Sequence, residues 1–170
     1  MISASTKDPD SMSSSSPQLY FEDFAVGQTH LGASRTISQA DVLAFASLTG
    51  DAHPIHYDAD YARTTRFGRP IVHGLHLMSL TALGAAPISA RLRDSMVAFL
   101  QQGASFLKPV FVDDTVRSSF EVIETERKPQ RDWGRVKFHV TLANQSGETV
   151  LNAFHVYRLR CRTAATRESQ

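Results

Sequence analysis

The stretch that decides the fold is IVHGLHLMSLTALGAAPI, residues 71–88. It carries no formal charge, but it contains two histidines, two glycines and Pro87. A membrane-spanning helix needs about 20 mostly apolar residues, whereas a soluble helix that is apolar on all sides is usually buried within a domain. We therefore predict an apolar helix from about Gly74 to just before Pro87, at the centre of a soluble domain.

The sequence after this helix has the pattern of β-strands. Residues 116–122 and 136–142 place apolar side chains at every second position, as strands with one buried face do. Residues 96–107 and 149–160 are also strand-like, and Gly103 predicts a bulge. Helices in the first half and strands in the second indicate an α+β fold. The simplest arrangement is an antiparallel sheet curved around the long central helix.

A second helix is predicted at residues 40–48. Ser38 is its N-cap, Asp41 lies three residues further on, and Gly50 ends it. Because Pro54 disfavours helical geometry in the residue before it, residues 50–57 form a loop. Asp58 then caps a short helix that runs to about Arg66.

The composition excludes several classes of protein. The 170 residues include 18 basic and 17 acidic side chains, a formal net charge of +1, which gives no sign of nucleic-acid or membrane binding. Cys161 is the sole cysteine, which excludes an internal disulfide and a multi-cysteine zinc site. The length fits one domain, expected at residues 18–162 between tails at 1–17 and 163–170. Without a recognisable secretory signal, we expect a cytoplasmic protein.

The densest polar cluster is TGDAHPIH, residues 49–56. On a regular helix Asp51 and His56 would point about 140° apart, but in a loop tightened by Pro54 they can converge. A carboxylate and an imidazole that face one water molecule form a general acid–base pair. The alternative is a carboxylate that ends a helix and a histidine that satisfies a core hydrogen bond.

Gly74 lies where the apolar helix begins. The first amides of a helix have no partner within it and favour a developing negative charge. Glycine also lets a substrate carbonyl approach the backbone closely, so Gly74 is a candidate oxyanion donor. The alternative is a glycine that only allows close packing against the sheet.

These motifs resemble those of the MaoC-like dehydratases, also called R-specific enoyl-CoA hydratases. Residues 51–56 (DAHPIH) and 67–74 (FGRPIVHG) carry the resemblance. It is supported by residues 20–27, 106–110, 113–115 and 144–148, and it spans about residues 19–160. Two positions differ from the family pattern: His53 replaces the usual asparagine, and Ala82 replaces a serine that some members carry.

The resemblance implies a hot-dog fold and a catalytic Asp51–His56 pair, with the Gly74 amide as oxyanion donor. The substrate would be a trans-2-enoyl thioester of coenzyme A, or an R-3-hydroxyacyl thioester in the reverse direction. We assign the proton of the attacking water to Asp51 and protonation of the α-carbon to His56. No metal or organic cofactor is expected, and the chain should form a homodimer or a higher oligomer. The remaining expected substrate contacts are His53, Pro54, Phe67, His73 and Leu75.

Three other functions remain open. Hot-dog proteins include acyl-CoA thioesterases, but residues 74–86 offer no carboxylate for that reaction. A non-catalytic acyl-thioester binding module would keep the pocket without turnover. A metal-binding protein is suggested by the His-x-x-His spacing of His53 with His56 and of His73 with His76. Pro54 and Gly74 interrupt the helical geometry that such metal pairs prefer.

Overall fold

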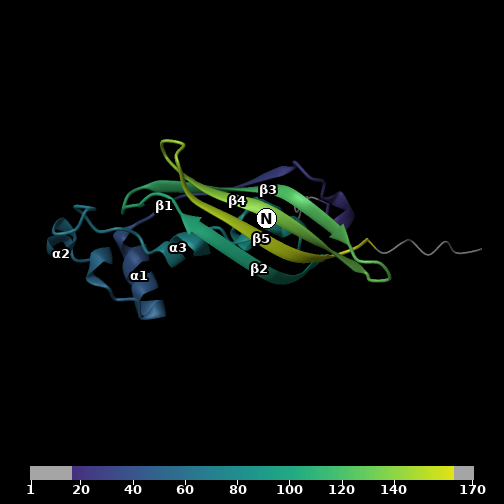
Figure 1. Ribbon diagram of the computed structural model, residues 1–170. Helices are drawn as coiled ribbons and strands as arrows, with labels where there is room; N and C mark the ends of the chain where they lie inside the picture. Colours follow the sequence, from purple (N-terminus) through teal and green to yellow (C-terminus); the bar gives the residue numbers. More distant parts are fainter. Residues whose placement is uncertain (1–16, 163–170) are drawn as a thin grey trace, which may run out of the picture.

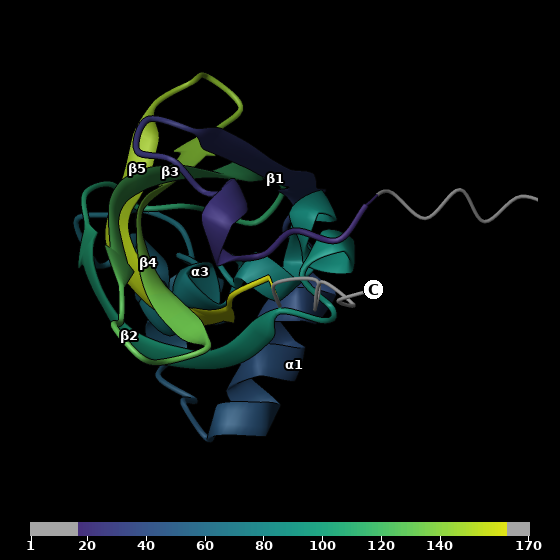
Figure 2. The same ribbon diagram turned by 90° about the vertical axis from the view of Figure 1, so that its right-hand side faces the viewer.

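The computed structural model describes residues 17–162. Five antiparallel strands form one sheet in the order β1-β3-β4-β5-β2. Figure 2 shows the sheet curving around α3, while Figure 1 shows α1 and α2 beyond one end of the sheet. The expected α+β architecture is therefore confirmed. The strands are β1 (Thr29–Thr36), β2 (Met96–Phe106), β3 (Thr115–Arg127), β4 (Trp133–Asn144) and β5 (Thr149–Arg160).

The inner face of the sheet supplies most of the core. Buried and less buried positions alternate along much of β3, β4 and β5, as the period-two sequence pattern predicts. The buried positions include Phe120, Val122, Phe138, Val140, Leu142 and Leu151. Because β1 and β2 lie at the two edges, each has one side without a strand partner among residues 17–162.

The central helix is shorter than predicted. Helix α3 spans only Gly74–Ser79, and the chain continues as 3₁₀ turns η3 (Leu83–Ala85) and η4 (Pro87–Arg91). The hydroxyl groups of Ser79 and Thr81 donate to the carbonyls of His76 and Met78, each over 2.7 Å. Such side-chain bonds compete with the helical ladder, and Pro87 cannot continue it. Among the described residues, no helix is long and apolar enough to cross a membrane.

Helix α1 (Gln39–Thr49) has the predicted caps. The Ser38 hydroxyl accepts from the Asp41 amide over 3.2 Å, and the Asp41 carboxylate accepts from the Ser38 amide over 2.9 Å. Gly50 ends the helix in the left-handed region at φ 75°, where glycine is unstrained. These features set where the loop that follows begins.

The short elements beside α1 also follow the prediction, with shifted boundaries. Asp58 accepts from the first amides of α2 (Ala59–Arg63), a helix that stops three residues before Arg66. Two further 3₁₀ turns are η1 (Phe21–Asp23) and η2 (Pro54–His56). The expected tails lie outside the described residues, apart from Pro17, whose carbonyl accepts from the Arg91 side chain over 3.0 Å.

The prediction of a bulge at Gly103 is wrong. The register of β2 against β5 shifts between Met96 and Ala98 and between Phe99 and Gln101, whereas Gly103 pairs regularly with Phe154. A Cβ on Gly103 would lie 2.6 Å from the Phe154 ring. The absence of a side chain therefore makes room for a neighbouring aromatic ring.

Candidate active site

The loop between α1 and α2 holds the candidate acid–base pair. Thr49 donates its hydroxyl to the Phe45 carbonyl over 2.7 Å and accepts from the Asp51 amide over 3.3 Å. The Tyr57 hydroxyl donates to the Ala52 carbonyl over 2.8 Å. Pro54 opens η2, which carries His56. These bonds fold residues 50–57 back on themselves.

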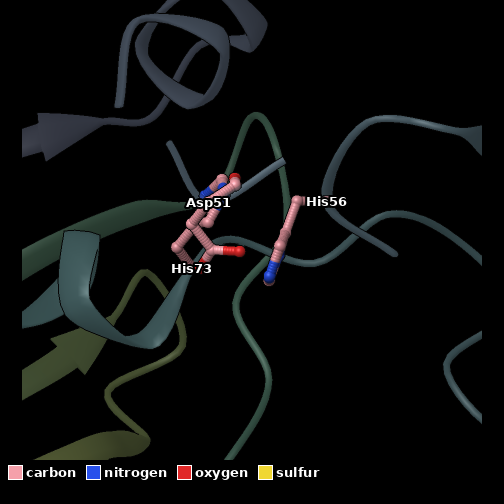
Figure 3. Close-up of side chains that lie close together, drawn as sticks. All are labelled: Asp51, His56 and His73. Carbon is pink, nitrogen blue, oxygen red and sulfur yellow. The ribbon is translucent and has the colours of Figure 1, made fainter. Parts of the chain in front are cut away.

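Three side chains converge at this loop. The candidate ligand atoms of Asp51, His56 and His73 all lie within 4.8 Å of one another, and Figure 3 shows the three side chains gathered at one place. Asp51 and His56 come from the loop, whereas His73 immediately precedes α3. The loop therefore does bring the Asp51 and His56 side chains together, as Pro54 led us to expect.

The proton on His56 is placed by its environment. The Nδ1 atom lies 2.7 Å from the Ile71 carbonyl oxygen, and because a carbonyl can only accept, Nδ1 carries the hydrogen. The neutral ring then leaves Nε2 as an acceptor. Burial lowers the pKa of His56 below its usual 6.5, although the Ile71 hydrogen bond and Asp51 oppose this shift. His56 is therefore a neutral base near pH 7.

His73 lies behind the pair and not on an open surface. It is only 1% exposed, so the structure gives no support to its expected contact with substrate. Its Nε2 atom lies 3.0 Å from the Asp51 backbone carbonyl. Its ring stacks on that of His56, with centroids 3.7 Å apart and planes inclined by 23°.

A cavity of about 270 Å³ adjoins Gly74. Phe106 forms one wall, since a Cβ on Gly74 would lie 3.0 Å from its ring. Ile71, which accepts from His56, also contributes to the lining. The expected contact Phe67 lies here too, and Arg66 and Lys108 add positive charge. The Phe106 and Lys108 positions belong to a motif noted in the sequence, but their proximity to Gly74 arises only in the fold.

The other expected contacts separate into two groups. His53 caps η2: its Nδ1 accepts from the Ile55 amide over 3.3 Å, as an asparagine oxygen could at an N-cap. Its ring lies 6.4 Å from that of His56, and Pro54 follows it in η2. Leu75 is 61% exposed and lines a different cavity of about 480 Å³.

That second cavity has a polar wall that sequence reasoning missed. His155 and Tyr157 line it, and the two His155 ring nitrogens lie 3.3 Å from the Thr81 hydroxyl and 3.2 Å from the Tyr157 hydroxyl. Thr81 lies more than 70 residues before His155 and Tyr157 in the sequence, so no local pattern predicts that it contacts His155. Only the period-two pattern of β5, which turns residues 155 and 157 to one face, could have indicated part of this wall.

The histidine pairs with metal-like spacing are not the side chains that the structure brings together. The structure groups His56 with His73 and Asp51 instead of with His53. The rings of His56 and His73 are nearly parallel, so their in-plane lone pairs run side by side. A tetrahedral zinc ion needs lone pairs that converge on one point, and the donor set fits such an ion poorly.

Comparison with known proteins identifies the family. A family model described as the MaoC like domain matches residues 23–144. The chain belongs to the MaoC-like domain family. Its curved five-stranded sheet around a central helix is the hot-dog fold, as expected from the sequence.

Two relatives of this MaoC-like chain are enzymes named for their reactions. The 3-hydroxybutyryl-CoA dehydratase of Methylorubrum extorquens is 39% identical over 106 residues, which are 62% of this chain and 65% of the relative. The (R)-specific enoyl-CoA hydratase of Aeromonas caviae is 42% identical over 89 residues, 52% of this chain and 64% of the relative. The chain thus spans just under two thirds of the length of these curated relatives.

Solved structures match over a larger part of the MaoC-like chain. A monoamine oxidase regulatory protein from Archaeoglobus has a TM-score of 0.81 and 34% identity, and the match covers 87% of this chain and 98% of that one. The (R)-hydratase of A. caviae has a TM-score of 0.67 and 31% identity, with 83% and 99% covered. The similarity therefore extends over nearly the whole of both solved chains.

Proposed function

We propose that this MaoC-like protein adds water to trans-2-enoyl-CoA thioesters with R specificity, and dehydrates R-3-hydroxyacyl-CoA in reverse. The observation that carries the proposal is the convergence of Asp51 and His56 beside the start of α3. The names of the Methylorubrum and Aeromonas relatives support the same reaction class.

The state of His56 suggests how the proton moves. A neutral ring with hydrogen on Nδ1 can accept at Nε2. In hydration, Nε2 takes one proton from water as the hydroxyl oxygen bonds to the β-carbon. The enolate then takes that proton from Nε2 at its α-carbon, so water is added and the neutral ring is restored. The Asp51 carboxylate orients the water and stabilises the imidazolium. His56 thus takes over the base role that the sequence analysis gave to Asp51, and it keeps its role as the proton donor to the α-carbon.

Gly74 supplies the second element of the proposed site. As the double bond is attacked, negative charge builds on the thioester oxygen. The first amide of α3 has no partner within the helix and donates to that oxygen, and the loss of one such donor costs on the order of 3 kcal/mol in transition-state stabilisation. The adjoining cavity, with Phe67 and Phe106 in its lining, takes part of the thioester.

The proposal includes a homodimer built on the β2 edge. The outer side of β2 has backbone groups without a strand partner among the described residues. This strand and the residue after it also carry six apolar side chains whose exposed fractions lie between 37% and 50%: Met96, Val97, Phe99, Leu100, Phe106 and Leu107. A long apolar edge strand invites pairing with another strand. A second copy of the same edge, related by two-fold symmetry, would cover it.

Neither a metal nor an organic cofactor is part of the proposed reaction, because proton transfer and oxyanion stabilisation suffice. We expect dialysis against EDTA to leave hydration of crotonyl-CoA unchanged, and loss of activity that zinc restores would count against this expectation.

A cytoplasmic location is also proposed, since a chain with a single cysteine suits a reducing compartment. Cell fractionation would test it.

The decisive test is hydration of crotonyl-CoA by two variants, followed by the loss of conjugated-thioester absorbance. Asp51→Asn removes the carboxylate charge, and His56→Asn keeps a donor for the Ile71 carbonyl but removes Nε2. Each should lose about 10²–10⁴ in rate while folding normally. The control is His139→Gln on β4. Unchanged activity in both site variants would refute the assignment.

Two further measurements separate the competing functions. Chiral analysis should find only the R-3-hydroxy product. Release of free thiol at the rate of substrate loss would indicate a thioesterase, and tight binding of crotonyl-CoA without turnover would indicate a binding module.

A further inference from the structure

His73 touches both members of the catalytic pair without lying on an open surface. Its Nε2 bonds to the Asp51 carbonyl over 3.0 Å, and its ring stacks on His56 at 3.7 Å. Phe45 packs near the His73 ring, with centroids 5.1 Å apart. The side chain is 1% exposed, so it can act on the reaction only through its neighbours.

We propose that His73 is a positioning residue that holds Asp51 and His56 in the arrangement needed for catalysis. The inference rests on the proposed hydratase function and deepens it. It assigns two separate tasks to one side chain: Nε2–H tethers the Asp51 backbone, and the ring face fixes the plane of His56.

The tether matters because little else restrains Asp51. The residue follows the left-handed turn at Gly50 and is exposed. Its amide bonds to the Thr49 hydroxyl over a long 3.3 Å. The bond from His73 joins this loop residue to the start of α3, which also carries Gly74. It therefore fixes the acid–base pair relative to the proposed oxyanion donor.

The stack acts on His56 in two ways. The Ile71 bond fixes one ring nitrogen, and the His73 ring limits rotation about the remaining torsion, so Nε2 stays aimed at one place. The His73 ring also disfavours a positive charge on its neighbour and so helps to lower the pKa of His56. Both effects favour a correctly directed neutral base.

Histidine at this position carries a structural cost. A carbonyl acceptor places the hydrogen on Nε2, and the buried Nδ1 has no hydrogen-bond partner among the described residues. An unsatisfied buried polar atom is destabilising, and an apolar side chain of similar size would avoid this. The Nε2 donor to Asp51 is what an imidazole supplies here and an apolar side chain cannot.

Two substitutions separate the tether from the stack. His73→Phe keeps an aromatic face but removes the donor, and His73→Gln places an amide N–H near the position of Nε2 but removes the ring. We expect His73→Phe to lose about 10²-fold in kcat with little change in KM, because a displacement of about 1 Å costs that much. His73→Gln should lose clearly less, because it keeps the tether and removes only the stack. His139→Phe and His139→Gln are matched controls on β4.

A titration of the His56 ring by NMR gives a readout that does not depend on turnover. The groups around this ring are Asp51 and His53 from its own loop, His73 before α3, and the Ile71 carbonyl. Both His73 variants should raise the pKa of His56, since the neighbouring imidazole is gone. The His139 controls should leave it unchanged.

The outcomes are distinct. The proposal would be overturned if the Phe and Gln variants lost kcat equally. It would also be overturned if kcat only followed the folded fraction of each variant while the pKa of His56 did not change. If the wild-type protein hydrates no enoyl thioester, the proposed function fails, but the His56 titration still decides whether His73 controls its neighbour.

Discussion

At the scale of single residues, neighbours decide what a histidine can do. His56 and His155 share a side chain but not an environment. His56 is half-buried and bonds to one carbonyl, whereas His155 is buried between two hydroxyl groups. The first is partly open to solvent, whereas the second is closed off from it. The spacing of histidines in the sequence does not reveal this difference.

The pH dependence of hydration should distinguish the two possible roles of His56. Burial lowers the pKa of His56 below 6.5, so a base role keeps activity high at neutral pH and lets it fall only below that depressed pKa. An acid role would require the protonated ring, and activity would then decline as pH rises. We expect the first profile in kcat/KM for crotonyl-CoA, with the acid limb centred below about 6.5.

His155 should make the protein sensitive to acid. Burial lowers the pKa of His155 from 6.5 to about 4, so below pH 6.5 the unfolded chain takes up a proton that the folded chain resists. The stabilisation is complete above about pH 6.5 and is lost as pH falls toward 4. Between pH 7 and 4.5, wild type should therefore lose about 2 kcal/mol more unfolding free energy than His155→Phe.

Urea unfolding at the two pH values measures this difference. Comparing each protein with itself removes any loss of packing that the substitution causes at pH 7. The same pH dependence in wild type and variant would show that His155 is not the group responsible.

At the scale of elements, the ends of the helices determine where the residues of the candidate site lie. The capping box at Ser38 and Asp41 and the left-handed Gly50 fix both ends of α1, so the loop with Asp51 begins at a defined point. Helix α3 is fixed differently. It stops after Ser79 because side-chain hydroxyls and Pro87 interrupt the helical bonds. Helix α3 begins at Gly74, as predicted, but it is shorter than predicted.

Loss of the N-cap of α1 should destabilise the fold. Ser38→Ala removes the acceptor for the Asp41 amide and should lower the unfolding free energy by about 1 kcal/mol. Gln39→Ala, at the adjacent exposed position, should stay within about 0.5 kcal/mol of wild type. Urea denaturation would measure both, and equal stability of the two variants would contradict the capping role.

At the scale of the whole molecule, the curved sheet explains both the enclosed core and the exposed β2 edge. Curvature brings β1 and β2 around α3 (Figure 2), and the core fills the concave side. The convex side carries charged pairs, among them Lys128 with Glu126. The apolar β2 edge has no such charged cover along most of its length.

The oligomeric state should depend on that edge. We expect the wild-type protein to sediment as a dimer at micromolar concentration. Leu100→Lys on β2 should shift it toward monomer, because a buried charge at a strand interface is unfavourable. The control is Ile123→Lys on β3, which replaces a side chain that is 41% exposed away from the edge and should leave the dimer intact. A monomeric wild type would refute the dimer proposal.

The sequence by itself determined the fold class, the four strands of the second half, both ends of α1 and the start of α3. These follow from apolar periodicity and from capping residues, which act over a few neighbours along the chain. It also predicted that Asp51 and His56 would meet, because Pro54 tightens the loop of residues 50–57 that carries both.

The tertiary structure alone decided the place of His73, the proximity of Phe106 to Gly74 and the bonds between Thr81 and His155. These contacts join segments from 17 to 74 residues apart. No local pattern specifies them, because they depend on how the sheet curves over the helix and on which buried polar atoms then find partners.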